Sequence, residues 1–354
     1  MQAFIAIVSF LVVIIVLVLA HELGHFLTAK AKGVKVVEFG VFYPPRLFSR
    51  KYGDTLYSLN TFPLGGFVKL AGEEDPKASG SLAGKSIGTR FLVLSSGALT
   101  NLLLPFVFFA VAAMVPHPVL KGTIHIVDVA PGSPAQAAGI ATGDTLLAVN
   151  GQHLNSSLDL SRNIQLHLGS PITILLQHPD GTQANVTLTP RWKPPEGQGA
   201  AGVTTNMTDA TIVRESSPFW RAIPDGAVYC VQTFVLFKNG IISMIIGAVP
   251  AQFTGPVGIA QLSGEYASAG IGPLLEFAAF LSINLGIFNL FPLPALDGGR
   301  LAFVVLEWIR RGKRVAPKTE ALVHTIGFVL IMVFFLAVTY QDIARIITGR
   351  PLGG

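Results

Sequence analysis

The feature that most constrains this chain is an apolar run near its N-terminus that ends in ionisable residues. Residues 4–20 carry no charged side chain and are long enough, at about 1.5 Å per residue, to cross most of a bilayer of roughly 30 Å. The run continues directly into HELGH, residues 21–25. Ionisable groups inside membrane segments are rare and usually functional, so this run predicts a membrane-spanning helix that carries a functional site.

Composition agrees with a membrane protein. Of the 354 residues, 51% are apolar and 13% are charged, and the mean hydropathy is +0.57. The first apolar run lacks a basic N-terminal region and a small-residue cleavage site, which argues against a cleaved signal peptide. We expect a polytopic α-helical membrane protein with about four transmembrane helices, in the windows Phe4–Ala20, Phe91–Val115, Pro273–Phe291 and Ala321–Thr339.

The basic residues predict how the chain is oriented. The formal net charge is +5, but the basic residues flank the apolar windows instead of alternating with aromatic side chains, so we expect a lipid bilayer and no nucleic acid as partner. Between Lys30 and Arg90 there are ten Lys or Arg and five Asp or Glu, and residues 310–314 read RRGKR. Basic loops favour the cytoplasmic side, which places both termini and residues 116–270 outside the cytoplasm.

The HELGH sequence has the spacing of a metal site. On a helix, positions i and i+4 share one face, so His21 and His25 can bind one zinc ion. Zinc lowers the pKa of bound water, and a neighbouring carboxylate that is not a ligand can take the proton, which makes Glu22 the candidate catalytic residue. The alternative is a chance match at a helix end, where the side chains reach water.

Catalytic zinc generally has three protein ligands, so a third must come from elsewhere. The residues after HELGH offer none in register, and Glu38 falls in a predicted strand. The better candidate is Asp297, in NLFPLPALDGGR (residues 289–300), where two prolines break the helix and Gly298-Gly299 allow a tight turn. A carboxylate on a broken helix at membrane depth implies a water-accessible cavity. The alternative is that Asp297 only caps the next helix.

The rest of the chain divides by pattern. Short β-branched and aromatic runs at 34–42, 55–60 and 64–72 predict a β-hairpin region on the cytoplasmic side. The segment 219–272 is predicted to be amphipathic and to lie on the membrane surface, although residues 219–249 could instead form a fifth span.

The predicted organisation of the whole chain is 1–30 first span, 31–90 hairpin region and loop, 91–116 second span, 120–190 soluble domain, 191–218 linker, 219–272 surface segment, 273–305 third span, 306–320 basic loop, 321–341 fourth span and 342–354 tail.

The soluble domain resembles a known module. PGSPAQAAGI followed by GDTLLAVNG is similar to a PDZ domain of the bacterial membrane-protease type, which implies one extracytoplasmic α+β PDZ domain. In such domains a peptide C-terminus pairs with a strand beside a helix, here Gly122, Thr123 and Ile124 beside the helix at 157–168. The alternative is a folded spacer that binds no peptide.

Three signatures occur together: H-E-x-x-H in the first span, N-x-x-P-x-P-x-L-D-G at 289–298, and the PDZ-like domain between them. In this order they resemble the site-2 protease family of intramembrane metalloproteases, in its bacterial RseP-type branch. The resemblance implies a protein of the bacterial inner (cytoplasmic) membrane that binds Zn²⁺ through His21, His25 and Asp297, with Glu22 as catalytic residue. It also implies that the β-hairpin region is membrane-associated, and it implies substrate-binding residues, namely Asn289, Asn101 and the strand edge Gly65, Gly66, Phe67 and Val68.

The expected function is therefore an intramembrane zinc metalloendopeptidase that cleaves single-span membrane proteins. The resemblance implies two substrate classes, anti-sigma factors already cut once and remnant signal peptides. One alternative is a non-catalytic PDZ membrane scaffold with a structural metal, against which Glu22 argues, because a structural site has no use for that carboxylate. Another is a zinc transporter, which would need ionisable residues along several spans. Arg300 is expected to reach lipid phosphate, and the alternative is that it supports Asp297. The remaining histidines, His324 among them, show no paired spacing and are expected at the surface or in packing.

Overall fold

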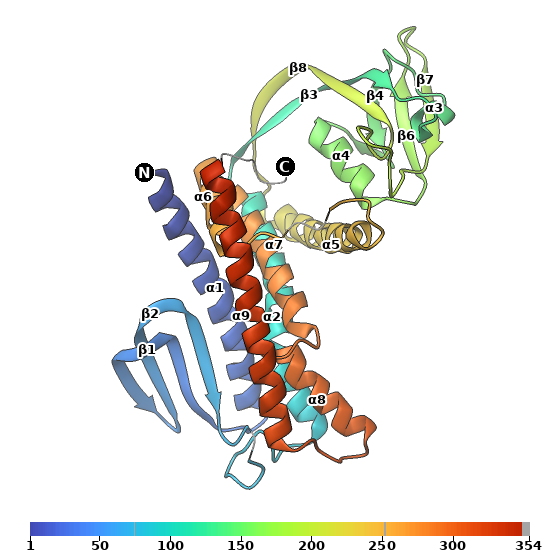
Figure 1. Cartoon of the computed structure of the whole chain (residues 1–354). Coiled ribbons are helices and arrows are strands. Elements are labelled where there is room, and N and C mark those ends of the chain that lie inside the picture. The colour runs from blue at the N-terminus through green and yellow to red at the C-terminus, as the bar shows by residue number, and fades with distance from the viewer. Residues whose placement is uncertain (74, 251–252, 349–354) are drawn as a thin grey trace. The chain divides into compact units, whose positions relative to one another are not determined.

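A computed structural model of the chain describes residues 1–73, 75–250 and 253–348, the side chain of Leu64 excepted. The chain forms two compact units. The helical unit comprises residues 1–112, 222–226 and the chain from Phe253 onward, and the sheet unit comprises residues 113–221 together with the chain that follows Gly226 as far as Pro250. Figure 1 shows the elements of both units along the chain.

The helical unit contains the predicted apolar windows. Its helices are α1 (Gln2–Ala31), α2 (Ile87–Met114), α6 (Pro256–Ala269), α7 (Ile271–Leu290), α8 (Asp297–Ile309) and α9 (Pro317–Thr348). Each of the four predicted windows lies in a helix that is long and apolar enough to cross a membrane, namely α1, α2, α7 and α9. A fifth helix, α5 (Phe219–Ile245), also meets these criteria of length and composition.

Three predicted boundaries were wrong. Residues 306–309 still belong to α8 and not to the basic loop. The segment 219–272 contains α5 and α6 and ends inside α7, which begins at Ile271. The predicted tail begins inside α9, which continues to Thr348; Asp342, at the predicted boundary, accepts a 2.8 Å hydrogen bond from the backbone N–H of Gly258 at the start of α6. The last part of that tail, residues 349–354, lies outside the described residues.

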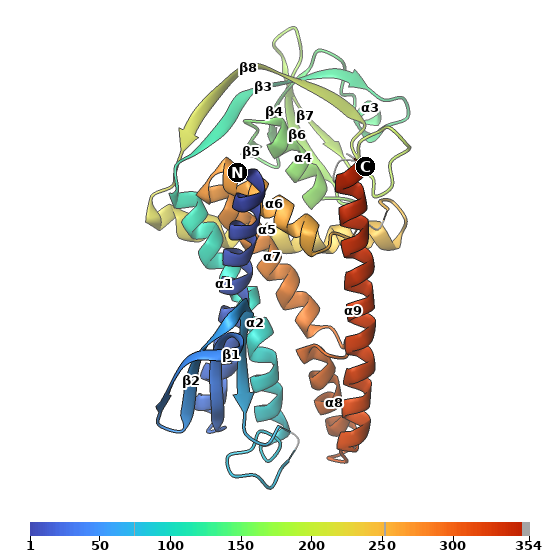
Figure 2. The same cartoon turned by 60° about the vertical axis from the view of Figure 1, so that its left-hand side comes forward.

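The hairpin region is a sheet built from two long strands, β1 (Val36–Tyr52) and β2 (Thr55–Leu70). The first part of β1, residues 36–41, pairs with 66–70 on one side and with 56–59 on the other, while residues 46–52 pair with 55–60. The sheet therefore has four runs in the order 66–70, 36–41, 55–60 and 46–52, and the run 66–70 forms an edge. Figure 2 shows this sheet beside α1, which β2 contacts.

A buried polar network organises the sheet around Glu38. Its carboxylate accepts hydrogen bonds from Arg46 at 3.1 and 2.6 Å and from the Ser58 hydroxyl at 2.7 Å. Burial acts to raise the pKa of Glu38, but the hydrogen bonds from Ser58 and Arg46 outweigh it and hold that pKa below its usual range. Glu38 lies in a strand, as predicted, and its carboxylate joins neighbouring runs of the sheet through these hydrogen bonds.

The sheet unit begins with β3 and is antiparallel. Its elements are β3 (His117–Val129), α3 (Pro134–Ala137), β4 (Thr145–Val149), β5 (Gln152–His153), α4 (Ser157–Leu166), β6 (Ile172–Gln177), β7 (Gln183–Leu188), β8 (Val203–Glu215) and most of α5. The strand order is β7-β6-β4-β3-β8, with β5 paired to β4. Side chains from β3 and β6, including Ile124, Ile126 and Ile172, form a fully buried core. Ser156 caps α4 and exchanges two hydrogen bonds with Asp159.

The predicted linker 191–218 was wrong for residues 203–215, which form β8. This strand pairs along the whole of β3, from His117 opposite Glu215 to Val129 opposite Val203. Its pairing has a physical reason: β4 lies on one edge of β3, and β8 supplies hydrogen-bond partners for the backbone groups of the opposite edge. Residues 191–202 and 216–218 form connecting loops.

The predicted peptide groove was also misplaced. Thr123 and Ile124 pair with β8 on one side, and Ile124 pairs with Leu146 of β4 on the other. The backbone N–H of Gly122 donates to the carbonyl of Asn155 at 2.9 Å. Both edges of β3 are therefore occupied, and no peptide can add to this strand without displacing part of the fold. The outermost strand on this side is β8, which contacts α4.

Candidate metal centre

The three predicted ligand residues come together in the helical unit. His21 and His25, one turn apart on α1, are buried, and their Nε2 atoms lie 3.2 Å from each other. Asp297, the first residue of α8, places Oδ2 2.9 Å from His21 Nε2 and 3.1 Å from His25 Nε2. In a tetrahedral site with bonds of 2.0–2.2 Å, ligand atoms lie about 3.3–3.6 Å from one another. The three atoms lie 2.9–3.2 Å from one another, so a small outward movement of the side chains gives this spacing.

The hydrogen bonds of His25 show why a cation fits here. Its Nδ1 lies 2.8 Å from the carbonyl of Val93 and must donate to it, so the neutral ring leaves a lone pair on Nε2. That lone pair faces a carboxylate oxygen of Asp297 at 3.1 Å. Two lone-pair atoms repel at this distance, and a metal ion between them turns the repulsion into two bonds.

Asn101 is placed to favour the same tautomer in His21, in which Nδ1 carries the proton. Its side-chain amide lies 3.3 Å from His21 Nδ1, and it is fully buried in α2. Among the described residues, its Oδ1 atom has no hydrogen-bond partner. Because the O and N atoms of an amide exchange places by a flip, Oδ1 can accept from a protonated Nδ1, which leaves His21 Nε2 free for a metal. The flip moves the amide nitrogen to the position that Oδ1 now occupies, and it leaves a lone pair on His21 Nε2 that faces Asp297, so the residues present fit a bound metal.

Close approach of α1 and α2 depends on two glycines. A Cβ atom at Gly97 would lie 2.3 Å from His25 Nε2 and 2.7 Å from His21 Nε2. On the facing helix, a Cβ atom at Gly24 would lie 2.3 Å from Thr100 Oγ1 and 2.6 Å from the carbonyl of Ser96. Real side chains do not fit at either place, so α2 forms the wall directly behind the imidazole nitrogens.

Asp297 is delivered by the predicted break between α7 and α8. A Cβ atom at Gly298 would lie 1.9 Å from the carbonyl oxygen of Phe291, so this turn requires glycine. Ala295 has a φ of +71°, a left-handed conformation that costs an ordinary residue about 1–2 kcal/mol. Asp297 follows the N-cap residue Leu296, and its Oδ2 atom faces both histidines. Capping is therefore not its whole role.

Glu22 lies between the histidines and the edge of the β sheet. The backbone N–H of Val68 donates to its carboxylate. A Cβ atom at Gly66 would lie 2.9 Å from a Leu19 methyl and 3.8 Å from Glu22 Cγ, and Gly65, with a φ of +115°, approaches Val18 equally closely. The N–H of Leu70 likewise points away from β1, to Glu73 Oε1 at 3.2 Å. The predicted strand edge thus runs along α1 beside Glu22.

Other predicted residues have separate positions. Asn289 is half-buried in the last turn of α7, and the ring of Phe67 stacks on Tyr43 with centroids 5.9 Å apart. Gly122, Thr123 and Ile124 belong to the sheet unit and are not part of this centre. Arg300, expected to reach lipid phosphate, instead forms an ion pair with Glu73 at 2.6 Å. The carbonyl of Val93, which holds His25, was missed because a backbone atom leaves no sequence signal.

Comparisons with known proteins agree with this geometry. The model of Peptidase family M50 matches residues 9–334. A putative zinc metalloprotease of Clostridium acetobutylicum is 34% identical over 336 residues, covering 93% of this chain and 94% of that protein. Zinc metalloprotease RasP of Geobacillus kaustophilus is 31% identical over 425 residues, covering 96% and 98%. A putative zinc metalloprotease of Campylobacter jejuni is 31% identical and covers 96% and 94%.

The wall formed by α2 predicts that Gly97→Ala abolishes metal binding. The new methyl group would occupy space within 2.3 Å of His25 Nε2, so the two imidazoles must turn away from each other. Gly88→Ala is the matched control, because a Cβ atom at that α2 position meets nothing within 4 Å. We expect zinc content, measured by atomic absorption of the purified proteins, to fall at least about tenfold in the first variant only. Full zinc occupancy in Gly97→Ala would contradict the described approach of α2.

Proposed function

The chain belongs to peptidase family M50 and is an intramembrane zinc metalloprotease, and we propose that His21, His25 and Asp297 bind its zinc ion while Glu22 is the catalytic base. The observation that carries the assignment is the convergence of three ligand atoms within 2.9–3.2 Å of one another. Among the described residues, this is the group of His, Cys, Asp and Glu side chains that can hold a metal. It offers three protein ligands and leaves room for water or substrate.

When bound, zinc polarises the scissile carbonyl and activates water for attack on it. Glu22 is adjacent to the ligands in sequence without belonging to the ligand triangle, so its carboxylate is available to take a proton from the attacking water. It can then return that proton to the departing amine. Asn101 orients His21 through Nδ1, and the carbonyl of Val93 orients His25. We assign Asn289 as a further donor to the substrate backbone, from its position near the end of α7.

We propose that the edge strand at Gly65–Val68 binds the substrate in extended form. A transmembrane helix hides its amides in hydrogen bonds within the helix, so a single-span substrate must unwind before a carbonyl is accessible. Strand addition stabilises the unwound form. The N–H of Val68 is directed away from β1 and toward Glu22, so a strand paired at this edge lies next to the base. Anti-sigma factors that have been cut once and remnant signal peptides are the proposed substrates.

Two alternatives are weaker. A scaffold with a structural metal does not explain why Glu22 lies between the ligands and the edge strand, and a structural zinc site closes with a fourth protein ligand. A zinc transporter needs metal-binding groups along a path, whereas the described residues present this one group of three.

Replacing the catalytic carboxylate tests the mechanism. We expect Glu22→Gln to lower cleavage of a purified single-span substrate by about 10²-fold or more while zinc content is retained, since general acid and base catalysis contributes that much. Asp297→Asn should lose zinc as well as activity, and Val68→Pro should lower activity with zinc retained. Glu265→Gln, on exposed α6 surface, is the control. Unimpaired cleavage by Glu22→Gln would contradict the role of Glu22 as catalytic base. Full zinc occupancy in Asp297→Asn would contradict the role of Asp297 as a zinc ligand.

We propose that the sheet unit and both termini lie outside the cytoplasm of a bacterial inner membrane. Support comes from the basic segments at 30–90 and 310–314, and from α5. The Cζ atom of Arg162 in α4 lies 4.7 Å from the ring centroid of Tyr229 in α5. Further along α5, the side-chain amide of Asn239 donates to the carbonyl of Gln165 at 2.7 Å. The two contacts on α5 are separated by about 15 Å along its axis. A helix packed lengthwise on a soluble domain belongs at the membrane surface.

A reporter fused after Thr189 tests this orientation. We expect alkaline phosphatase at that position to be active and green fluorescent protein to be dark when exported through the Sec pathway, because the domain is translocated. The same two reporters fused after Lys313 should give the reverse pattern. A cytoplasmic signal after Thr189 would overturn the orientation.

For the domain formed by β3 to β8, we propose a PDZ fold whose peptide-binding edge is β8 beside α4. This edge replaces the one first expected on β3, since β8 is the outermost strand and contacts α4. A peptide that ends in a free carboxylate should slow hydrogen exchange of amides in residues 203–208 of the whole protein, and its C-terminally amidated form should not. Equal exchange with and without peptide would favour a folded spacer.

A further inference from the structure

The segment that precedes Asp297 depends on contacts from another helix for its backbone conformation. Residues 291–296 connect α7 to α8, and Ala295 within them has the left-handed backbone conformation described above. Such a conformation in a residue with a Cβ persists only where surrounding contacts hold it. The contacts come from α9, a helix that supplies no ligand to the metal centre.

Two residues of α9, one turn apart, face this segment. His324 Nδ1 lies 2.9 Å from the backbone nitrogen of Ala295, whose N–H donates to it. Nδ1 must therefore be unprotonated, with the ring proton on Nε2. At Gly327, a Cβ atom would lie 2.1 Å from Pro294 Cβ, so Pro294 fills the space that a side chain would need. Positions i and i+3 share a helix face, which makes these contacts one continuous support.

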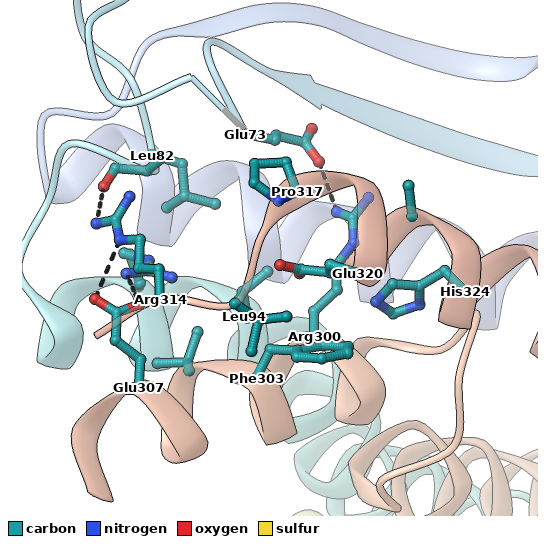
Figure 3. A pocket seen from close by; sticks show the side chains of 15 residues that line it. Glu73, Leu82, Leu94, Arg300, Phe303, Glu307, Arg314, Pro317, Glu320 and His324 are labelled. Atoms are coloured by element: carbon teal, nitrogen blue, oxygen red, sulfur yellow. Dashed lines mark hydrogen bonds and ion pairs between the residues drawn. The ribbon is translucent and has the colours of Figure 1, made fainter. Parts of the chain in front are cut away.

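The imidazole of His324 is itself fixed by α8. Its ring lies 5.7 Å from that of Phe303, centroid to centroid, and Cε1 lies 3.1 Å from the position of a Cβ at Gly299. Figure 3 shows His324 at the pocket lined by α8 and the start of α9, beside Arg300 and Phe303. Arg300, which follows Asp297 by about one turn, is held in turn by Glu73 at 2.6 Å. The ring is thus packed on α8 and hydrogen-bonded to the segment before it.

We propose that His324 is a positioning residue for the metal centre: by accepting the N–H of Ala295, it holds the α7–α8 connection in the conformation that presents Asp297 to His21 and His25. The inference rests on the proposed role of Asp297 as zinc ligand. It goes beyond that role by assigning a function to α9, which otherwise contributes no group to the chemistry. Hydrogen bonds that orient a ligand typically change metal affinity by about 10- to 100-fold when removed.

Two substitutions of similar size separate the hydrogen bond from the packing. His324→Asn keeps an acceptor at nearly the place of Nδ1. His324→Leu has as many side-chain heavy atoms as the Asn variant but no acceptor. His324→Phe keeps a ring against Phe303 and also lacks the acceptor. Thr325→Ala, on another face of α9, is the control, since its hydroxyl bonds only within the helix at 2.9 Å.

The measurement is zinc release from the full-length protein in detergent micelles, followed with a chromophoric chelator. We expect the Leu and Phe variants to release zinc about tenfold or more faster than wild type, and the Asn and Thr325→Ala variants to match wild type. The cobalt-substituted Leu and Phe variants should show altered d–d absorption bands, which report ligand geometry independently of activity. Thermal melting in the apo state identifies any variant that is not folded.

The outcomes separate the inference from the function on which it rests. Wild-type release rates in the Leu and Phe variants would overturn the role of His324, and so would an Asn variant that releases zinc as fast as Leu. If Asp297→Asn also releases zinc at the wild-type rate, the ligand assignment itself fails. If Asp297→Asn releases zinc rapidly while Leu and Phe do not, the ligand assignment stands and only the support from α9 is refuted.

Discussion

The contact on which the rest of this structure depends is between Asp297 Oδ2 and the two imidazole nitrogens of α1. It joins side chains that are 272 residues apart in sequence and come from different helices. A carboxylate facing two nitrogen lone pairs is unfavourable without a cation, so the proposed zinc ion would also stabilise the packing of α1 against α8. The glycines at 24, 97 and 298 all serve this contact, because each removes a Cβ that would keep the backbones apart.

Groups from three elements surround the centre. Val93 and Asn101 approach from α2, the edge strand of β2 lies beside Glu22, and α9 supports the connection before Asp297. Rigid support matters because a hydrolytic site must keep its catalytic groups in place relative to the bond that is cleaved.

Sequence reasoning found the parts of the fold and site that have a regular period or a short motif. The apolar windows marked α1, α2, α7 and α9, and the spacing of His21 and His25 on a helix marked the metal site. Asp297 was found through its prolines and glycines, which signal a broken helix, and through family resemblance. These features are local, so a linear pattern contains them.

What sequence reasoning missed depends on pairing across long separations. Residues 203–215 follow a loop rich in Gly and Pro and were taken for its continuation, and only the partner edge of β3 reveals them as a strand. With β8 unseen, β3 appeared to have an open edge, and the peptide groove was assigned to Gly122, Thr123 and Ile124. His324 has no neighbouring histidine or carboxylate at metal-site spacing, so its bond to Ala295 was invisible until α9 was placed.

The pairing of β3 with β8 also decides how the domain formed by β3 to β8 is inserted into the chain. His117, just after α2, lies opposite Glu215, just before α5, and the backbone of Ser217 donates to the carbonyl of Ala113 at 2.7 Å. The domain therefore leaves and rejoins the chain at nearly one point. A domain whose two ends lie close together can be exchanged, duplicated or deleted during evolution with little effect on the chain before and after it.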